Sequence, residues 1–278
     1  MIHYVVAITF DLSEVDSAMD KLYIDFNCDL GELEDGGLSD RLILPFVTSA
    51  NIACGYHAGN KGSMERTVRA ALEFGCNIGA HPGFPDRENF GRTEMELTHR
   101  EIRQIVRDQI ASLGSICDEL GATISHVKPH GALYNMAARD YDISLAICEG
   151  VIDVYGDDCP IIFGLAGSKT KESAESLGLL FAGEVFSDRG YMPDGNLVPR
   201  TMAGALINDE TEIINRVIRM IVNKEVTAID GSVVPIQADT LCLHGDGEHA
   251  VIFAEKISDA LNNAGISLVP LNRDQING

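Results

Sequence analysis

The stretch TISHVKPHGALYN, residues 123–135, lies near the middle of the chain and contains two histidines and a lysine. Its first five residues have the composition of a strand, and side chains alternate between the two faces of a strand. His126, Lys128 and His130 therefore point to one side, up to the proline that ends the ladder. Unpaired lysine and histidine are costly in a core, so this pattern predicts a site that handles a carboxylate, a phosphate or a metal ion. The alternative is a solvated strand end.

Length and composition bound the class of protein. The chain has 278 residues, of which 45% are hydrophobic, enough for one large domain or two small ones. A formal charge of -21 disfavours nucleic acid and anionic lipid as partners. Seven scattered cysteines without a C-x-x-C pair predict reduced thiols and no cysteine zinc site. No apolar run has the length of a membrane span or the flank of a signal peptide, so we expect a cytoplasmic protein.

Segments typical of strands alternate with helical patterns along the chain, at residues 22–26, 49–54, 77–80, 123–127, 160–164, 179–186 and 240–243. This alternation predicts a parallel sheet. Every strand is followed by polar side chains, as the single active face of a closed barrel requires, whereas an open doubly wound sheet, the alternative, concentrates them at one switch point. We therefore expect one catalytic (β/α) barrel domain over residues 22–278, preceded by an N-terminal extension over residues 1–21.

The polar residues expected on this face form a set suited to hydrolysis of an amide or ester. Histidines and carboxylates from different strands can hold a divalent ion that activates water, with another carboxylate or histidine as general base. No two of the histidines form a helical H-x-x-x-H pair, so the metal interpretation depends on the barrel. The expected set is Asp25, Asn27, Asp29, Glu32, Asn51, His57, His81, His126, Lys128, His130, Ser168, Glu184, Asp188, Arg189, His244 and Asp246.

The segment GLAGSKT, residues 164–170, follows a strand and opens a helix. It differs from a P-loop, G-x-x-x-x-G-K-[ST], because Ser168 stands between the glycine and the lysine. ATP binding by this chain alone is therefore not predicted, although the backbone amides could form a nest for a carboxylate or phosphate. The sequence also lacks a G-x-G-x-x-G after a strand, which argues against a nicotinamide enzyme.

Several long motifs give the chain a family resemblance, at residues 25–32, 48–59, 78–83, 126–135, 194–200 and 241–246. Over about residues 22–271 the chain resembles the LamB/YcsF family, the A subunits of bacterial 5-oxoprolinase. The resemblance implies an irregular seven-stranded (β/α) barrel of the glycoside hydrolase/deacetylase type. It also implies ATP-dependent ring opening of 5-oxo-L-proline (pyroglutamate) to L-glutamate together with B and C subunits, which would bind ATP and activate the lactam.

The resemblance and the expected face together assign roles to particular residues. We expect Asp29, Lys128, Asp188 and Asp246 to be catalytic, and Asn27, Glu32, Asn51, His57, Arg189 and His244 to bind substrate. Related deacetylase-type barrels imply Asp29, His81 and His130 as ligands of a divalent metal ion, with His57 in reserve. The family's usual Gly-aromatic-Gly run after Gly31-Glu32 is replaced here by residues 33–37, LEDGG, so the shape of that loop is an open point.

Two other functions stay open at this point. One is a stand-alone metal-dependent amidase or carbohydrate deacetylase that uses the same face, and needs a metal but neither ATP nor partners. The other is a non-catalytic subunit that binds a small molecule.

Overall fold

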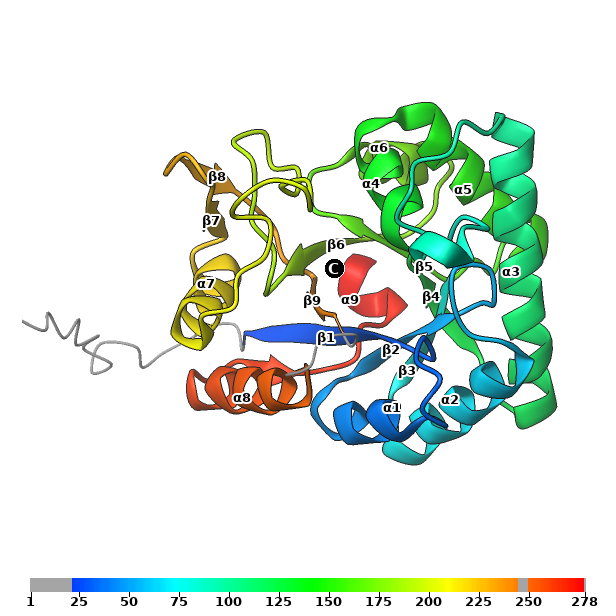
Figure 1. Ribbon diagram of the computed structural model, residues 1–278, viewed down its shortest axis with the longest axis horizontal. Helices are drawn as coiled ribbons and strands as arrows, with labels where there is room; N and C mark the ends of the chain where they lie inside the picture. The colour runs from blue at the N-terminus through cyan, green and yellow to red at the C-terminus, as the bar shows by residue number, and fades with distance from the viewer. Residues whose placement is uncertain (1–21, 245–249, 278) are drawn as a thin grey trace, which may run out of the picture.

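The computed structural model describes residues 22–244 and 250–277 (Figure 1). Seven parallel strands form a closed ring in which each pairs with the next and the last, β9, pairs with both β6 and β1. The predicted irregular seven-stranded (β/α) barrel is thereby confirmed. Its strands are β1 (Tyr23–Leu30), β2 (Ser49–Ala53), β3 (Asn77–His81), β4 (Ile124–Val127), β5 (Ile161–Leu165), β6 (Phe181–Phe186) and β9 (Thr240–Leu243).

Helices cover the outside of the ring, as Figure 1 shows. The longest, α3, begins at a capping box, in which Thr98 and Glu101 each bond the other's backbone amide. The helices are α1 (Leu38–Ile43), α2 (Lys61–Phe74), α3 (His99–Leu120), α4 (Gly131–Arg139), α5 (Tyr141–Tyr155), α6 (Lys169–Ser176), α7 (Glu210–Val222) and α8 (Ala250–Asn263), with short 3-10 turns at η2 (Leu44–Phe46) and η3 (Arg87–Asn89).

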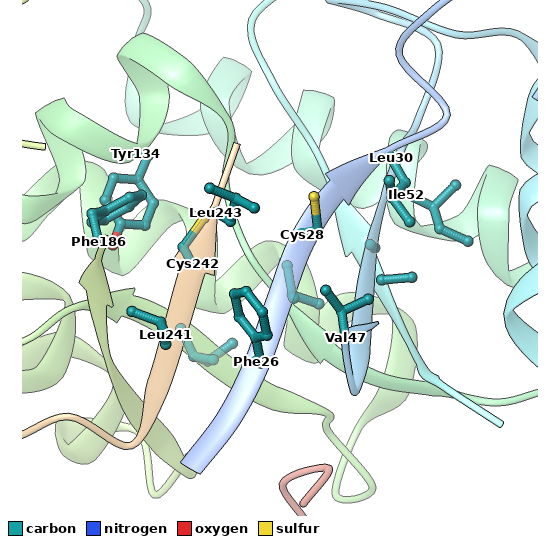
Figure 2. Close-up of a cluster of buried hydrophobic side chains, with 14 of the residues drawn as sticks. Phe26, Cys28, Leu30, Val47, Ile52, Tyr134, Phe186, Leu241, Cys242 and Leu243 are labelled. Carbon is teal, nitrogen blue, oxygen red and sulfur yellow. The ribbon is translucent and has the colours of Figure 1, made fainter. Parts of the chain in front are cut away.

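Strand β1 shows how the sequence separates core from site. Its even-numbered residues Phe26, Cys28 and Leu30 join the apolar layer between barrel and helices. Figure 2 shows Phe26 and Cys28 beside β9, and Leu30 beside Ile52 of β2. Its odd-numbered residues from 25 to 29 bond side chains of other strands in the barrel interior. All residues of β1 after Tyr23 are buried, so one strand supplies an apolar outer face and a polar inner face.

The segment after α8 closes the end of the barrel where the strands begin. There β10 (Ser267–Leu268) pairs with the start of β1, and α9 (Arg273–Asn277) follows, drawn in red across the middle of Figure 1. Leu271 packs on Ile161, Phe163 and Ala182, and its carbonyl accepts a hydrogen bond from Asn77. Each of these contacts involves one of the first three residues of a strand.

Asp25 lies at this closed end, so its expected place on the active face was wrong. Its carboxylate accepts hydrogen bonds from the hydroxyls of Ser49, Thr48 and Thr240, and burial raises its pKa. The strand pattern correctly predicted that Asp25 points into the barrel, but Asp25 lies at the end where the strands begin and not at the active face.

One further feature lies outside the ring. Strands β7 (Glu225–Thr227) and β8 (Val233–Pro235) form an antiparallel hairpin after α7. Within residues 22–244 and 250–277, the helices lack the combination of length and hydropathy needed to cross a bilayer. The expected extension over residues 1–21 lies outside the described residues, so the proposed domain division stays a prediction.

Candidate active site

A cavity of about 650 Å³ opens where the strands end. Six of the predicted site residues line it, namely Asp29, His81, Lys128, His130, Arg189 and His244, together with Tyr134, Leu165 and Phe186. Another cavity, of about 430 Å³, lies against α7 and β7 and contains none of the predicted residues. The chemistry-bearing side chains thus gather in the cavity at the carboxyl ends of the strands, as in other β/α barrels.

Lys128 stands at the floor of the cavity between two carboxylates. Its Nζ lies 2.7 Å from Asp29 Oδ1, 3.0 Å from Glu184 Oε1 and 3.0 Å from Cys242 Sγ. Burial alone would lower the pKa of Lys128, but Asp29, with Cys242 and Glu184, raises it well above its usual value. Burial likewise opposes ionisation of Asp29, yet His81 and Lys128 hold its pKa well below the usual range. The floor therefore carries an ammonium paired with ionised carboxylate.

Asn27 and Asn51 lie one layer deeper and do not line the cavity. The amide of Asn51 donates to Asp29 Oδ1 and to Asn27 Oδ1, both at 2.7 Å, while Asn27 donates to Glu184 Oε1 at 3.0 Å. His126 Nε2 bonds Asn51 Oδ1 at 2.7 Å. These amides fix the two carboxylates from below, so their geometry suits positioning better than the predicted contact with substrate.

Beside this ion pair, Glu32, His57, His81 and His130 bring ligand-type atoms within 4.8 Å of one another, and all four are buried. Glu32 Oε1 lies 3.3 Å from His57 Nε2, 3.4 Å from His130 Nδ1 and 3.8 Å from His81 Nε2. Donors bound about 2.1 Å from a tetrahedral zinc ion are about 3.4 Å apart, so these spacings fit one divalent cation.

Two histidines are held by backbone carbonyls so that their remaining ring nitrogens face each other. His81 Nδ1 lies 2.7 Å from the carbonyl of Lys128, and His130 Nε2 lies 2.8 Å from the carbonyl of Phe90. Carbonyls only accept, so both of these nitrogens carry protons, and the other two ring nitrogens, His81 Nε2 and His130 Nδ1, face each other at 2.9 Å. Burial, then His57, holds the pKa of His130 well below its usual value. A cation between the two rings resolves this contact, and carbonyl-held tautomers are typical of metal ligands.

This cluster differs in one member from the predicted ligand set. His81, His130 and the reserve His57 are present, but Glu32 stands where Asp29 was expected. Asp29 remains adjacent, with Oδ2 at 3.4 Å from His81 Nε2. Asp29 lies closer to Lys128, at 2.7 Å. At the end of β1, Asp29 thus forms the ion pair, and Glu32 is the carboxylate placed to bind a metal ion.

The loop of residues 84–97 holds the histidines from outside. Phe90, whose carbonyl binds His130, has a left-handed φ of 57°, and the next residue, Gly91, packs directly on the rings. A Cβ on Gly91 would lie 2.7 Å from His57 Cβ. His57 and His130 stack with centroids 3.8 Å apart, so this loop and the ring stack fix the cluster together.

A second polar group forms the opposite wall. His244 Nδ1 lies 3.0 Å from Asp188 Oδ2, and its Nε2 lies 3.3 Å from Arg200. The Phe186 ring stacks on His244 at 5.5 Å. Although burial opposes ionisation, His244 keeps the pKa of Asp188 below its usual value. An imidazole backed by a carboxylate can move a proton at the cavity wall, while Asp246, the other predicted catalytic residue here, lies outside the described residues.

Arg189 lines the cavity but is anchored to the chain. Its guanidinium donates to the carbonyls of Ala205 and Val198, and burial lowers its pKa to about 10. It shapes the loop over the cavity, and its predicted contact with substrate stays a prediction.

The sequence interpretation missed three lining or floor residues. Cys242 lies in β9, two residues before His244, which directly follows the strand. Because side chains alternate, the two point to the same side, so the sequence pattern could have identified Cys242. Tyr134 enters the cavity from α4 and lies against Phe186, as Figure 2 shows. Arg200 comes from a loop, where no periodicity marks it.

Comparisons with known proteins agree with this architecture. A model of the LamB/YcsF family matches residues 24–275. The chain is 39% identical to a lactam utilization protein from Thermus thermophilus, whose crystal structure superposes with a TM-score of 0.83 over 90% of this chain and 100% of that one. An uncharacterised protein from Agrobacterium tumefaciens shares the fold at 15% identity and a TM-score of 0.56, covering 91% of this chain and 89% of its own.

Proposed function

The chain belongs to the LamB/YcsF family, and from this we propose that it is the hydrolytic A subunit of an ATP-dependent 5-oxoprolinase. In this proposal it opens the lactam of 5-oxo-L-proline to L-glutamate, in the cytoplasm, together with B and C subunits that bind ATP. The likeness to a lactam utilization protein supports a cyclic amide as substrate. The absence of a P-loop match at residues 164–170 supports ATP binding by the partners.

The chemistry accounts for the use of ATP. A lactam carbonyl is a poor electrophile, and phosphorylation of its oxygen activates the ring carbon. Water then adds to that carbon, the carbon–nitrogen bond breaks, and the nitrogen takes a proton to become the amino group of γ-glutamyl phosphate. A second water releases phosphate and leaves glutamate. This chain must therefore direct water, supply a proton and hold an anion.

The residues of the cavity fit these tasks. The second carboxylate oxygen of Asp29, Oδ2, lies 3.4 Å from His81 Nε2, where it can accept a proton from water, while Lys128 neutralises charge that develops beside it. His244, whose Nδ1 is held by Asp188, can take up a proton at Nε2 and pass it to the departing nitrogen. Glu32, His57, His81 and His130 would hold a divalent ion, which when bound supplies a Lewis acid that lowers the pKa of water.

The observation that carries the proposal is the buried Asp29–Lys128–Glu184 group beside the histidine cluster, in a chain of this family. The test is glutamate release from 5-oxoproline and ATP by purified B and C subunits with and without this chain. We expect release to depend on the chain and to fall about 10²–10⁴-fold in Asp29→Asn, which keeps the shape of the side chain. Folded proteins that release glutamate equally without this chain would refute the proposal.

The histidine cluster favours one second candidate, a metal-dependent amidase that needs neither ATP nor partners. The chain stripped with a chelator and reloaded with Zn²⁺ should then hydrolyse a simple amide alone, and His81→Ala should abolish both turnover and metal binding. Metal binding without turnover of any amide would exclude this candidate and leave the lactam proposal intact.

A further inference from the structure

The turn between β5 and α6 forms a second, smaller cavity next to the first. It has a volume of about 240 Å³ and shares Arg139, Leu165, Asp194 and Asn196 with the main cavity. Sites for whole ligands are usually larger, about 300–1,000 Å³, so this space suits one group of a substrate whose remainder occupies the main cavity.

The start of α6 offers hydrogen-bond donors to this space. Ser168 is the N-cap residue, yet its side chain caps no backbone amide, and Lys169 and Thr170 open the helix. The first amides of a helix lack the usual acceptor four residues back, and the helix dipole places partial positive charge there. In α6 the Lys171 amide bonds the Ser168 carbonyl at 3.2 Å, so the amides of Lys169 and Thr170 are the donors offered to the cavity. Gly167, with φ 76°, turns the chain so that it enters the helix at this point.

Ser168 gives an independent indication of a ligand. It lines the small cavity, its exposed fraction is 8%, and among the described residues its buried hydroxyl has no hydrogen-bond partner. Buried hydroxyls are nearly always bonded, so this donor calls for an acceptor that the chain does not supply.

The charges at the cavity wall permit an anion. Lys169 and Arg139 line it, and each forms an exposed ion pair, with Glu172 and Glu94 respectively, of the kind that contributes little and exchanges readily. The Asp194 carboxylate accepts from the backbone and side-chain amides of Asn196 at 2.9 and 3.0 Å, so its oxygens are occupied locally.

We infer that this cavity is an oxyanion subsite that takes the phosphoryl group of the activated substrate. The inference rests on the proposed function, in which a phosphoryl group stays on the substrate from activation until the second water releases it. Amides at the start of α6 and the Ser168 hydroxyl bind its oxygens, while the ring lies toward Lys128 in the main cavity. The turn thus binds phosphoryl oxygens as a phosphate-binding loop does, although it lacks the P-loop sequence.

The test is calorimetric titration of the chain alone with inorganic phosphate, in a phosphate-free buffer. We expect binding, weakened about three- to tenfold in Ser168→Ala, which loses one hydrogen bond, and about tenfold or more in Ser168→Asp, which places a negative charge in the subsite. Aspartate is also a good N-cap, so this variant should unfold at the same temperature as the parent or higher. Lys171→Ala, an exposed position on the same helix that does not line the cavity, should bind phosphate as the parent does.

Two outcomes would overturn the inference: no binding of phosphate by the folded parent, or equal binding by the parent and Ser168→Asp. The oxyanion in the subsite could be the phosphoryl group or the carboxylate of the substrate. A parallel titration with 5-oxoproline distinguishes them, because Ser168→Asp should leave the binding of 5-oxoproline unchanged if the subsite takes the phosphoryl group. If instead only 5-oxoproline binding falls, the subsite takes the substrate carboxylate and the phosphoryl assignment is wrong. Phosphate binding needs no partner, so it distinguishes this inference from the proposed function: glutamate release can fail while the subsite stands.

Discussion

Lys128 provides positive charge that favours the ionised form of Asp29 inside the barrel. Its exposed fraction is 2%, and it contacts both Asp29 and Glu184 within 3.0 Å. A buried ion pair adds little net stability, but removing one partner leaves an uncompensated charge. The structural and catalytic roles of this lysine therefore cannot be separated by activity alone, and stability has to be measured as well.

Replacing Lys128 with methionine should lower the free energy of unfolding by about 3–5 kcal/mol, because Asp29 and Glu184 then face each other without a cation. Urea denaturation measures the loss. Adding Glu184→Gln to Lys128→Met should recover at least about 1 kcal/mol, since one carboxylate is gone. Lys171→Met, on the exposed face of α6, serves as control. Equal stability of Lys128→Met and the parent would contradict this account.

His126 should make stability depend on pH. Burial, then Lys128, lowers its pKa to about 3, whereas in the unfolded chain it takes a proton below about 6.5. The unfolded state thus binds the extra proton, and the free energy of unfolding must fall as pH drops from about 6.5 toward 3. His126→Asn should reduce this slope by up to about 1.4 kcal/mol per pH unit. Urea titrations at pH 7, 6 and 5, referred to pH 8, measure it; an unchanged slope would contradict burial of a neutral imidazole.

At the scale of elements, the loop of residues 84–97 fixes the histidine cluster through close backbone contact. Gly91 has a left-handed φ of 65° and touches His57 and His130. Gly121, which ends α3 with φ 68°, has open space around it. The two glycines therefore share a backbone conformation and differ in surroundings.

Gly91→Ala should cost roughly 2–4 kcal/mol of unfolding free energy, because the new Cβ meets His57 in addition to the backbone strain. It should also weaken Co²⁺ binding, followed by visible absorption, by about tenfold or more. The control Gly121→Ala should cost about 1 kcal/mol from strain alone and leave Co²⁺ binding unchanged. Similar losses in both variants would show that the loop does not position the cluster.

Most elements were predictable because their signals are local. Alternating side chains marked the strands, and the Thr98 capping box marked the start of α3. Helix α2 begins after Asn60, the N-cap, and Ser63 completes a reciprocal capping box with it. Helix α4 was missed because it begins with Gly131 directly after a histidine that makes no capping bond, and α9 because five residues show no helical period.

At the scale of the whole molecule, alternation indicates which face of a strand a residue occupies but not how deep in the barrel it lies. Asp25, Asn27 and Asp29 share one face of β1, yet the first reaches the closed end, the second the middle and the third the cavity. Depth depends on the register of neighbouring strands, which the sequence does not show. The same reason explains why Glu32 rather than Asp29 joins the three histidines.

The closed end of the barrel should matter for stability and not for chemistry. Leu271 is 3% exposed and packs on residues near the start of β5 and β6. Leu271→Ala should therefore lower the free energy of unfolding by about 2–4 kcal/mol, while glutamate release by the folded variant stays within about twofold of the parent. Arg273→Ala, an exposed neighbour that donates to the Cys159 carbonyl, should cost less. A large loss of activity in folded Leu271→Ala would mean that the two ends are coupled.

Ring closure joins parts of the chain that are far apart in sequence: Thr240 of β9 bonds Asp25 of β1 across 215 residues, and β10 pairs with the same strand. Until β9 docks, β1 and β6 each present an unpaired edge, and such edges can recruit other chains. Closing so long a loop is slow compared with forming a helix or a hairpin. The period between synthesis of β6 and arrival of β9 is thus when the nascent polypeptide is most exposed to aggregation, and when a chaperone would help it most.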